Sequence, residues 1–226
     1  MGLLRSCVRL AFMAYFNMFY KIDEIGKENI PKEGAYVLAS NHIHWMDPLL
    51  YVCECKRMVY AIGKEELFSN PIKNLIMRRL GVFPVKRDAV GSNTASINKS
   101  IEKLKEGNLF LIYPEGTRMG FYKGARTHKG VAMFALEAKV PIIPMAMVGS
   151  FKPFSKVRFI IDKPMDISEY YPKEGEKVDP RNIIKVSNQV VKRILELRDS
   201  IQTEEIEKEM LEEEKKREEK KKLKGG

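Results

Sequence analysis

The segment LASNHIHWMDPLL (residues 38–50) concentrates side chains that can move a proton, since it holds two of the three histidines and the single tryptophan. Asp47 follows His42 after a loop of four residues. A loop this short lets the carboxylate accept a hydrogen bond from ring atom Nδ1, which fixes the tautomer and leaves Nε2 facing outward as a base. No serine nucleophile is evident, so the pair suits direct deprotonation of a substrate hydroxyl.

The same segment also fits a purely structural interpretation. Asp47 and Pro48 make a good helix start, with aspartate as the N-cap and proline at the first helical position. The two interpretations are compatible, because one carboxylate oxygen can cap the helix while the other holds the imidazole.

A second histidine, His44, gives an H-I-H spacing that occurs in metal sites. A third ligand would have to come from His128 or a distant carboxylate, and no residue nearby supplies one. We therefore expect no metal, and His42 is the preferred base because of its five-residue step to Asp47.

The elements that position this segment follow from apolar runs that alternate with helical patterns. Strands are expected at residues 35–40, 58–64, 81–85, 108–114, 140–149 and 156–162, and helices at 48–56, 65–80 with a break at Pro71, 92–107, 128–139 and 180–202. This alternation predicts an α/β fold with a mostly parallel central sheet flanked by helices.

Three of these strands end at residues with chemical potential, and ligands of open α/β sheets gather at the carboxyl ends of strands. The residues at or near these ends are Asn41, His42, Lys86, Arg87, Glu115, Gly116, Thr117, Arg118 and, at the start of the next helix, Lys129. Gly116 suits a turn whose backbone N–H groups, together with the Arg118 guanidinium, can hold a phosphate. The alternative is a set of ordinary surface turns with solvated charges.

Composition narrows the class of partner. The chain has 226 residues, a hydrophobic fraction of 44% and a net charge of +10, and its three cysteines favour a reducing compartment. The last 24 residues hold nine acids and eight bases, so the remainder carries about +11. A basic body indicates nucleic acid, a membrane surface or a phosphorylated substrate. No helix-turn-helix or zinc-finger pattern supports nucleic acid.

The N-terminal residues 1–21 are mostly apolar, with Arg5 and Arg9 one helical turn apart. The apolar run from 10 to 20 is about half of the length needed to span a bilayer. This segment has three alternative interpretations: a packed core helix, a signal peptide without a cleavage site, or a chain acylated at Gly2. We prefer a helix in the membrane interface, with its aromatic face down and its arginines toward the headgroups.

Four stretches in order make the chain resemble the glycerophosphate/lysophosphatidate acyltransferase family, and within it the 1-acyl-sn-glycerol-3-phosphate O-acyltransferases. They are NHIHWMD (41–47), GVFPVKRD (81–88), YPEGTR (113–118) and VPIIP (140–144). Tyr113 replaces the usual Phe, and His44 stands where the family commonly has Ser or Thr. The resemblance covers roughly residues 22–162.

The resemblance implies acyl transfer from acyl-CoA or acyl carrier protein to the 2-hydroxyl of lysophosphatidate, giving phosphatidate without a metal or a bound cofactor. His42 would be the base and Asp47 its stabilising carboxylate. The implied substrate-binding residues are Arg87, Arg118, Glu115, Gly116 and Thr117, to which we add Lys86, Lys129 and Asn41. One alternative is an acyltransferase that acts on another acceptor, namely glycerol 3-phosphate, a lyso-ornithine lipid or another lysophospholipid. The other is a non-catalytic basic membrane- or nucleic-acid-binding protein.

The expected organisation has three parts. Residues 1–21 form the membrane-interface helix, residues 22–200 the acyltransferase domain, and residues 201–226 a charged tail that is helical or disordered. The expected location is the cytoplasmic face of a membrane, as a peripheral or monotopic protein, with no nucleic-acid partner.

Overall fold

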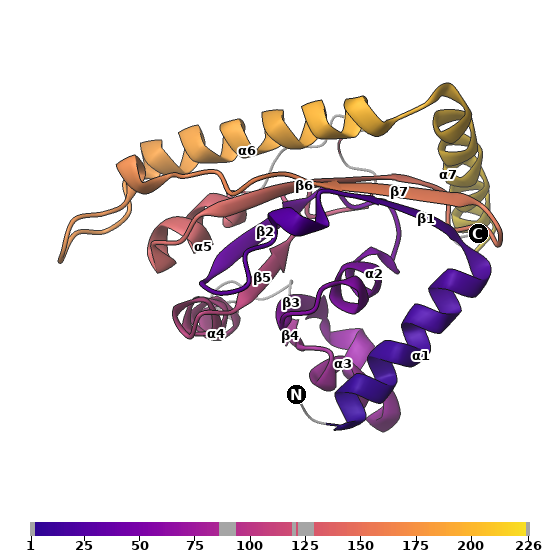
Figure 1. Ribbon diagram of the computed structural model, residues 1–226, viewed down its shortest axis with the longest axis horizontal. Helices are drawn as coiled ribbons and strands as arrows, with labels where there is room; N and C mark the ends of the chain where they lie inside the picture. Colours follow the sequence, from indigo (N-terminus) through magenta and orange to yellow (C-terminus); the bar gives the residue numbers. More distant parts are fainter. Residues whose placement is uncertain (1–2, 86–93, 119–120, 122–128, 225–226) are drawn as a thin grey trace.

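A computed structural model describes residues 3–85, 94–118, 121 and 129–224 (Figure 1). The helices are α1 (Leu3–Phe19), α2 (Asp47–Glu54), α3 (Pro71–Arg79), α4 (Thr94–Lys105), α5 (Gly130–Ala138), α6 (Pro180–Ile201) and α7 (Glu204–Lys224), with short 3-10 helices η1 (Lys27–Asn29), η2 (Glu65–Phe68) and η4 (Ser168–Tyr170). The strands are β1 (Lys21–Ile25), β2 (Tyr36–Ser40), β3 (Val59–Lys64), β4 (Val82–Val85), β5 (Leu109–Ile112), β6 (Ile142–Gly149) and β7 (Lys156–Ile161).

The seven strands form one sheet in the order β1-β7-β6-β2-β5-β3-β4. Neighbouring strands run parallel except β6 and β7, which are antiparallel. The predicted α/β fold with a mostly parallel central sheet is confirmed. Because β2 and β5 are adjacent and parallel, with Ala39 opposite Ile112, the loops that follow them leave the sheet at the same edge.

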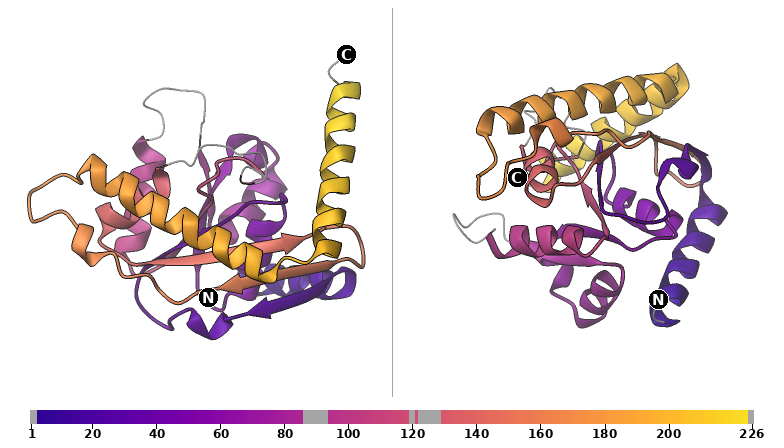
Figure 2. Two further views of the ribbon diagram at one scale, coloured as in Figure 1. Left: turned by 90° about the horizontal axis from the view of Figure 1, so that it is seen from above. Right: turned by 60° about the vertical axis from the view of Figure 1, so that its left-hand side comes forward.

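The helices cover the sheet in two layers, and side chains of each central strand alternate between them (Figures 1 and 2). On β2, Leu38 joins the core beneath α1 and α2, whereas Val37 and Ala39 join the core beneath α4, α5 and α6. Period-two alternation in strands that are buried on both faces explains why these segments are apolar throughout. The site therefore rests on strands that are fixed from both sides.

Two helices begin where the sequence places a capping residue before proline. Asn70 accepts hydrogen bonds from the N–H groups of the first turn of α3, and Asp179 accepts one at the start of α6. Pro71 and Pro180 follow them at the first helical position, where a missing N–H costs nothing. The expected helix over 65–80 is divided at Pro71 into η2 and α3, as predicted.

Strand β1 is absent from the sequence-based prediction. It is the segment KIDEI, which pairs with β7 at the edge of the sheet and is anchored there by Arg158, whose Nε lies 2.7 Å from Oδ2 of Asp23. Charged residues on an edge strand discourage pairing with other chains. They also remove the apolar pattern by which a strand is recognised, so the segment carries no strong strand signal.

Helix α1 packs along α2, and its arginines turn toward the protein rather than toward a headgroup region. Arg5 is only 6% exposed, and its guanidinium lies 3.5 Å from the carbonyl of Arg57. Arg9 donates from Nε to the carbonyl of Cys53 near the end of α2, at 2.5 Å. The expectation that these arginines face headgroups is therefore wrong. The outer face of α1 instead carries an exposed apolar stripe, formed by Leu10, Ala14 and Met18.

The C-terminal tail is a helix, α7, which turns away from the end of α6 (Figure 2). Its first half is attached to the domain, because Ile206 and Met210 are buried in the core beneath α1 and α2. The backbone N–H of Gly149 lies 3.2 Å from the sulfur of Met210. Within the described residues, no helix has both the length and the apolar character required to cross a bilayer.

Candidate active site

The loop between β2 and α2 is organised by one buried carboxylate. Oδ2 of Asp47 lies 2.9 Å from Nδ1 of His42 and accepts the N–H of Ile43 at 2.7 Å, and both carboxylate oxygens accept the N–H of His44, at 2.9 and 3.0 Å. The Asp47 side chain is fully buried. The predicted contact between His42 and Asp47 is confirmed, and a carboxylate that only accepts requires the proton to be on Nδ1.

The predicted N-cap role of Asp47 is wrong. Helix α2 begins at Asp47 with Met46 in the cap position, and no side-chain hydrogen bond caps this end. The carboxylate instead points back into the preceding loop, where it satisfies N–H groups and the imidazole. Pro48 still occupies the first turn, as expected.

One face of the His42 ring is covered, whereas its second nitrogen, Nε2, is accessible. The ring stacks on that of Tyr113, with centroids 4.3 Å apart and an interplanar angle of 24°. The side chain is 19% exposed, and in the described part of the chain nothing hydrogen-bonds to Nε2. A neutral imidazole in this state can accept a proton at Nε2 while the carboxylate stabilises the resulting cation.

Glu115 connects the two loops at this edge of the sheet. It is 2% exposed; Oε1 accepts the N–H of His42 at 2.7 Å and Oε2 accepts the N–H of Phe121 at 2.9 Å. The expectation placed Glu115 in a phosphate pocket. The structure places its carboxylate behind the base, where it fixes the backbone that carries the His42 ring.

Asn41 has a similar place in the interior. Its Nδ2 donates to the carbonyl of Met147 and its Oδ1 accepts the N–H of Met147, both at 2.7 Å. The side chain is fully buried. The amide predicted to bind substrate thus joins the end of β2 to β6. His42 is the next residue in the chain, so this pair of hydrogen bonds also holds the backbone that leads into His42.

Of the other predicted binding residues, the structure describes Gly116, Thr117, Arg118 and Lys129. Gly116 has a φ of 64°, the left-handed conformation that favours glycine, and its N–H donates to the carbonyl of Tyr113 at 3.1 Å, so the predicted turn is confirmed. Thr117 and Arg118 follow as exposed residues, and Lys129 is exposed where α5 begins. Lys86 and Arg87 lie outside the described residues.

His44 is directed away from His42. Its ring stacks on Phe151 with centroids 4.5 Å apart, and its Nδ1 accepts the N–H of Met46 at 3.4 Å. Over the described ranges, His, Cys, Asp and Glu side chains form no group of three that could hold a metal ion.

Among the described residues, the buried thiols and the buried serine nearest this loop are poor candidates for a nucleophile. Burial raises the pKa of Cys53 to about 12 and also raises that of Cys55, so both thiols stay protonated. The Ser40 hydroxyl is buried and lies 2.8 Å from the hydroxyl of Tyr51. The arrangement is therefore suited to deprotonating an external hydroxyl.

Tyr113 has a role that the sequence did not indicate, because the stacking depends on the register of β2 and β5. Its hydroxyl is buried, and no partner lies within hydrogen-bonding reach among the described residues. Burial, followed by the nearby Asp47 carboxylate, raises the pKa of Tyr113 well above its ordinary value. The hydroxyl is thus neutral, and no described residue satisfies it.

Replacing Tyr113 with phenylalanine is expected to stabilise the fold by about 1 kcal/mol, because it removes a buried donor without a partner and keeps the ring beneath His42. Urea unfolding measures the change. Tyr51→Phe is the matched control and should destabilise the protein, since the Tyr51 hydroxyl is hydrogen-bonded to Ser40. A loss of stability in Tyr113→Phe would show that this hydroxyl is satisfied in solution.

Fold and site together define an α/β domain in which a mostly parallel sheet presents a His–Asp pair at the carboxyl edge of its central strands. The protein-family model described as Acyltransferase matches residues 21–148, more than half of the 226 residues. The chain belongs to this acyltransferase family.

Individual relatives agree with this assignment. Proteins of Borreliella burgdorferi and Bacillus subtilis, both described as 1-acyl-sn-glycerol-3-phosphate acyltransferase, are each 30% identical to the chain. The first alignment covers 68% of this chain and 60% of the relative. The second covers 64% of this chain and 73% of the relative. The crystal structure of the 1-acyl-sn-glycerophosphate (LPA) acyltransferase PlsC from Thermotoga maritima matches with a TM-score of 0.63 at 27% identity, over 85% of this chain and 78% of that one.

Proposed function

We propose that the chain transfers a fatty acyl group from a thioester donor to the 2-hydroxyl of 1-acyl-sn-glycerol 3-phosphate, which gives phosphatidic acid. The observation that carries this proposal is the hydrogen bond of 2.9 Å between His42 and Asp47 in a member of the acyltransferase family. The descriptions of the relatives supply the acceptor, and the site supplies a base that suits an alcohol.

In the proposed reaction Nε2 of His42 removes the proton of the acceptor hydroxyl as its oxygen attacks the thioester carbonyl carbon. The carbon–sulfur bond then breaks, and the leaving thiolate takes the proton back from the imidazolium. Asp47 stabilises that cation between the two steps. General-base catalysis contributes about 10²–10⁴-fold, and the rest comes from holding both substrates together and from donors near the developing oxyanion.

The acceptor phosphate is assigned to cations on the loops beside His42. Arg118 follows the Gly116 turn and is exposed, with no ion pair to any described residue, and Lys129 opens α5. A guanidinium binds a phosphomonoester through paired hydrogen bonds. Lys86 and Arg87, at the end of β4, are proposed for the same site from the sequence alone. Glu115 and Asn41 act behind the base by positioning it.

The donor is proposed to be acyl-CoA or acyl carrier protein, because both present a phosphopantetheine thioester and negative charge to a basic body. Direct transfer needs no covalent intermediate on the protein, and no metal or bound cofactor enters it.

A panel of acceptors tests this function. Purified protein incubated with acyl-CoA or acyl carrier protein is expected to acylate lysophosphatidate far faster than lysophosphatidylcholine, since only the former offers a phosphomonoester to Arg118. Product is measured by mass spectrometry. Equal rates on both acceptors would contradict phosphate recognition, and no product with any acceptor would contradict acyl transfer.

We further propose that the chain works at a membrane surface, held there by the exposed stripe of Leu10, Ala14 and Met18 on α1. An apolar helix face of this kind lies in the interface rather than across the bilayer. Deleting residues 1–20 is not a clean test, because Phe16 and Tyr20 are part of the core. Sedimentation of the full chain with phospholipid vesicles tests the proposal, and protein that remains in the supernatant contradicts it.

A further inference from the structure

The outer side of α3 combines exposed apolar side chains with exposed cations. Ile72 is 69% exposed and Leu75 is 49% exposed, and Arg78 and Arg79 are exposed as well. Steps of three and four residues from Leu75 reach each of the other three, so all four side chains share one side of the helix. The opposite side of α3 packs on the core beneath α1 and α2. We call these four residues the α3 face.

The guanidinium of Arg78 is held in place by its neighbours. Its Nε donates to Oδ1 of Asn74 at 2.7 Å, and its Cζ lies 6.0 Å from the centroid of the Phe68 ring. Neither Arg78 nor Arg79 forms an ion pair within the described ranges. An arginine that is already positioned loses less conformational freedom when it binds a carboxylate. The α3 face therefore offers positive charge that is ready to pair with an acidic partner.

A pocket of about 510 Å³ lies beside Arg78, between η2 and α3, and its lining includes Glu65, Glu66 and Pro84 of β4. Because η2 follows the end of β3, the pocket adjoins the edge of the sheet where β2 leads into His42. Three strand spacings separate β4 from β2, about 14 Å in all. A phosphopantetheine arm has about as many chain bonds as four to five extended residues, so it reaches roughly 15 Å. A thioester on such an arm can pass from the pocket to the base.

We propose that the α3 face docks an acyl carrier protein, a small acidic protein that carries the fatty acyl thioester on its phosphopantetheine arm. The inference rests on the proposed function, and it gives one of the two proposed donors a binding surface. Carboxylates of the carrier pair with Arg78 and Arg79 through two parallel hydrogen bonds each. Ile72 and Leu75 supply the apolar contact at the centre of the interface, and arginine is itself a frequent anchor of such interfaces.

A protein partner fits the charges of this region better than a lipid surface does. Glu65 and Glu66 line the same pocket as Arg78, and densely anionic headgroups would repel both carboxylates. A folded partner can place its own carboxylates opposite the arginines and neutral or cationic groups opposite the glutamates. A second copy of this chain is a poor partner, because two α3 faces in contact would bring four arginines together.

Binding of fluorescein-labelled palmitoyl acyl carrier protein to the full chain tests docking directly, with fluorescence anisotropy as the measurement. The double variant Ile72→Ser with Arg79→Gln is expected to weaken binding about tenfold, the effect of losing one good anchor residue. Both side chains are exposed, so the variant should fold, and circular dichroism checks that it does. Added salt should weaken binding of the wild type, because the attraction is between charges at the surface.

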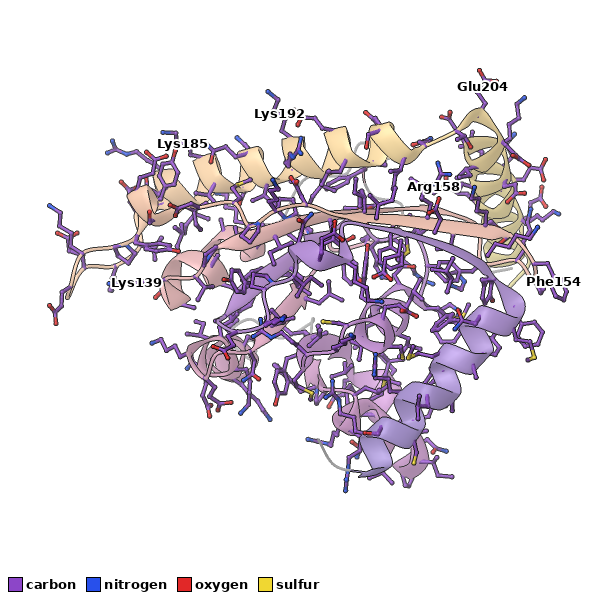
Figure 3. All side chains as sticks on the ribbon, viewed as in Figure 1. Lys139, Phe154, Arg158, Lys185, Lys192 and Glu204 are labelled. Atoms are coloured by element: carbon purple, nitrogen blue, oxygen red, sulfur yellow. The ribbon has the colours of Figure 1, made fainter. Side chains whose placement is uncertain are left out.

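The matched control makes the same two kinds of substitution on α6, as Ile184→Ser with Lys192→Gln. Ile184 is 43% exposed, and Figure 3 shows Lys192 on the outer side of α6, across the sheet from α3. This variant loses the same charge and a similar apolar side chain, so it should bind the carrier as the wild type does. Equal weakening by both double variants would reveal a general attraction to a basic protein and would overturn the assignment to α3.

A comparison of donors separates the docking surface from the proposed function. With lysophosphatidate as acceptor, the α3 double variant should lose about tenfold in kcat/KM for palmitoyl acyl carrier protein and keep the wild-type value for palmitoyl-CoA, which has no protein surface to dock. Transfer from palmitoyl-CoA by a wild type that does not bind the carrier would overturn docking and leave acyl transfer standing. Carrier binding without transfer from either donor would contradict acyl transfer instead.

Two outcomes for the α3 double variant would also overturn docking. An equal loss of kcat/KM with both donors would mean that these side chains do not recognise the carrier. Wild-type binding of the carrier, together with weaker sedimentation on phospholipid vesicles, would assign the α3 face to a lipid surface.

Discussion

Replacing His42 with alanine is expected to lower the turnover number of acyl transfer by about 10²–10⁴-fold, the usual contribution of a positioned general base. The substitution removes Nε2, the group proposed to take the hydroxyl proton. It leaves the backbone bond from His42 to Glu115 possible, so the loop should keep its course. Steady-state rates with lysophosphatidate and acyl-CoA measure the effect, and vesicle sedimentation should be unchanged.

His44→Ala is the matched control for this substitution. It removes an imidazole two residues away that stacks on Phe151, whereas the His42 ring stacks on Tyr113. We expect its turnover to fall much less than that of His42→Ala. If His42→Ala kept near wild-type turnover, another group would have to be the base. If the wild-type chain bound vesicles but showed no turnover, it would fit the alternative of a basic membrane-binding protein without catalysis. If His44→Ala were the more damaging change, the base would be assigned to the wrong ring.

The central part of the fold could be predicted because its strands are buried on both faces. Such strands are continuous apolar runs, and helical patterns separate them, which together indicate a parallel sheet. The contact of His42 with Asp47 was predictable for a local reason, since a loop of four residues lets the carboxylate reach the ring. Features that depend on sequence-distant partners were less accessible.

Glu115 and Tyr113 illustrate this difference. Their contacts with His42 exist because β2 and β5 are adjacent in the sheet with Ala39 opposite Ile112. Strand order is a tertiary property, so the YPEGTR segment indicated a turn and a cation but not the carboxylate and the ring beneath the base.

The orientation of α1 was mispredicted for a related reason. A pair of arginines one turn apart is compatible with lipid headgroups, but cations also interact favourably with carbonyls at the C-terminal end of another helix. Arg9 reaches Cys53 near the end of α2, and Arg5 reaches the segment that follows it. Periodicity reveals that a helix has two faces, whereas the neighbouring helix decides which face is turned inward.

Replacing Asp47 with asparagine is expected to reduce turnover by on the order of 10³-fold or more and to destabilise the fold. An amide has one acceptor oxygen where the carboxylate offers two to the ring of His42 and to the N–H groups of Ile43 and His44. Its NH₂ group would face one of these donors. The imidazole would then carry its proton on Nε2, and Nε2 could no longer accept the proton of the substrate. The equivalent change from aspartate to asparagine lowers turnover about 10⁴-fold in a serine protease triad.

The loss of stability should be about 1–3 kcal/mol, the cost of leaving a buried donor without a partner. Urea unfolding measures this loss, and rates are taken where circular dichroism shows the variant to be folded. Asp162→Asn is the control: this aspartate is partly exposed and lies 2.5 Å from Arg193 on α6, so its loss should leave turnover unchanged. Turnover of folded Asp47→Asn within tenfold of the wild type would show that this carboxylate does not orient the base, and the proton would have to be accepted without it.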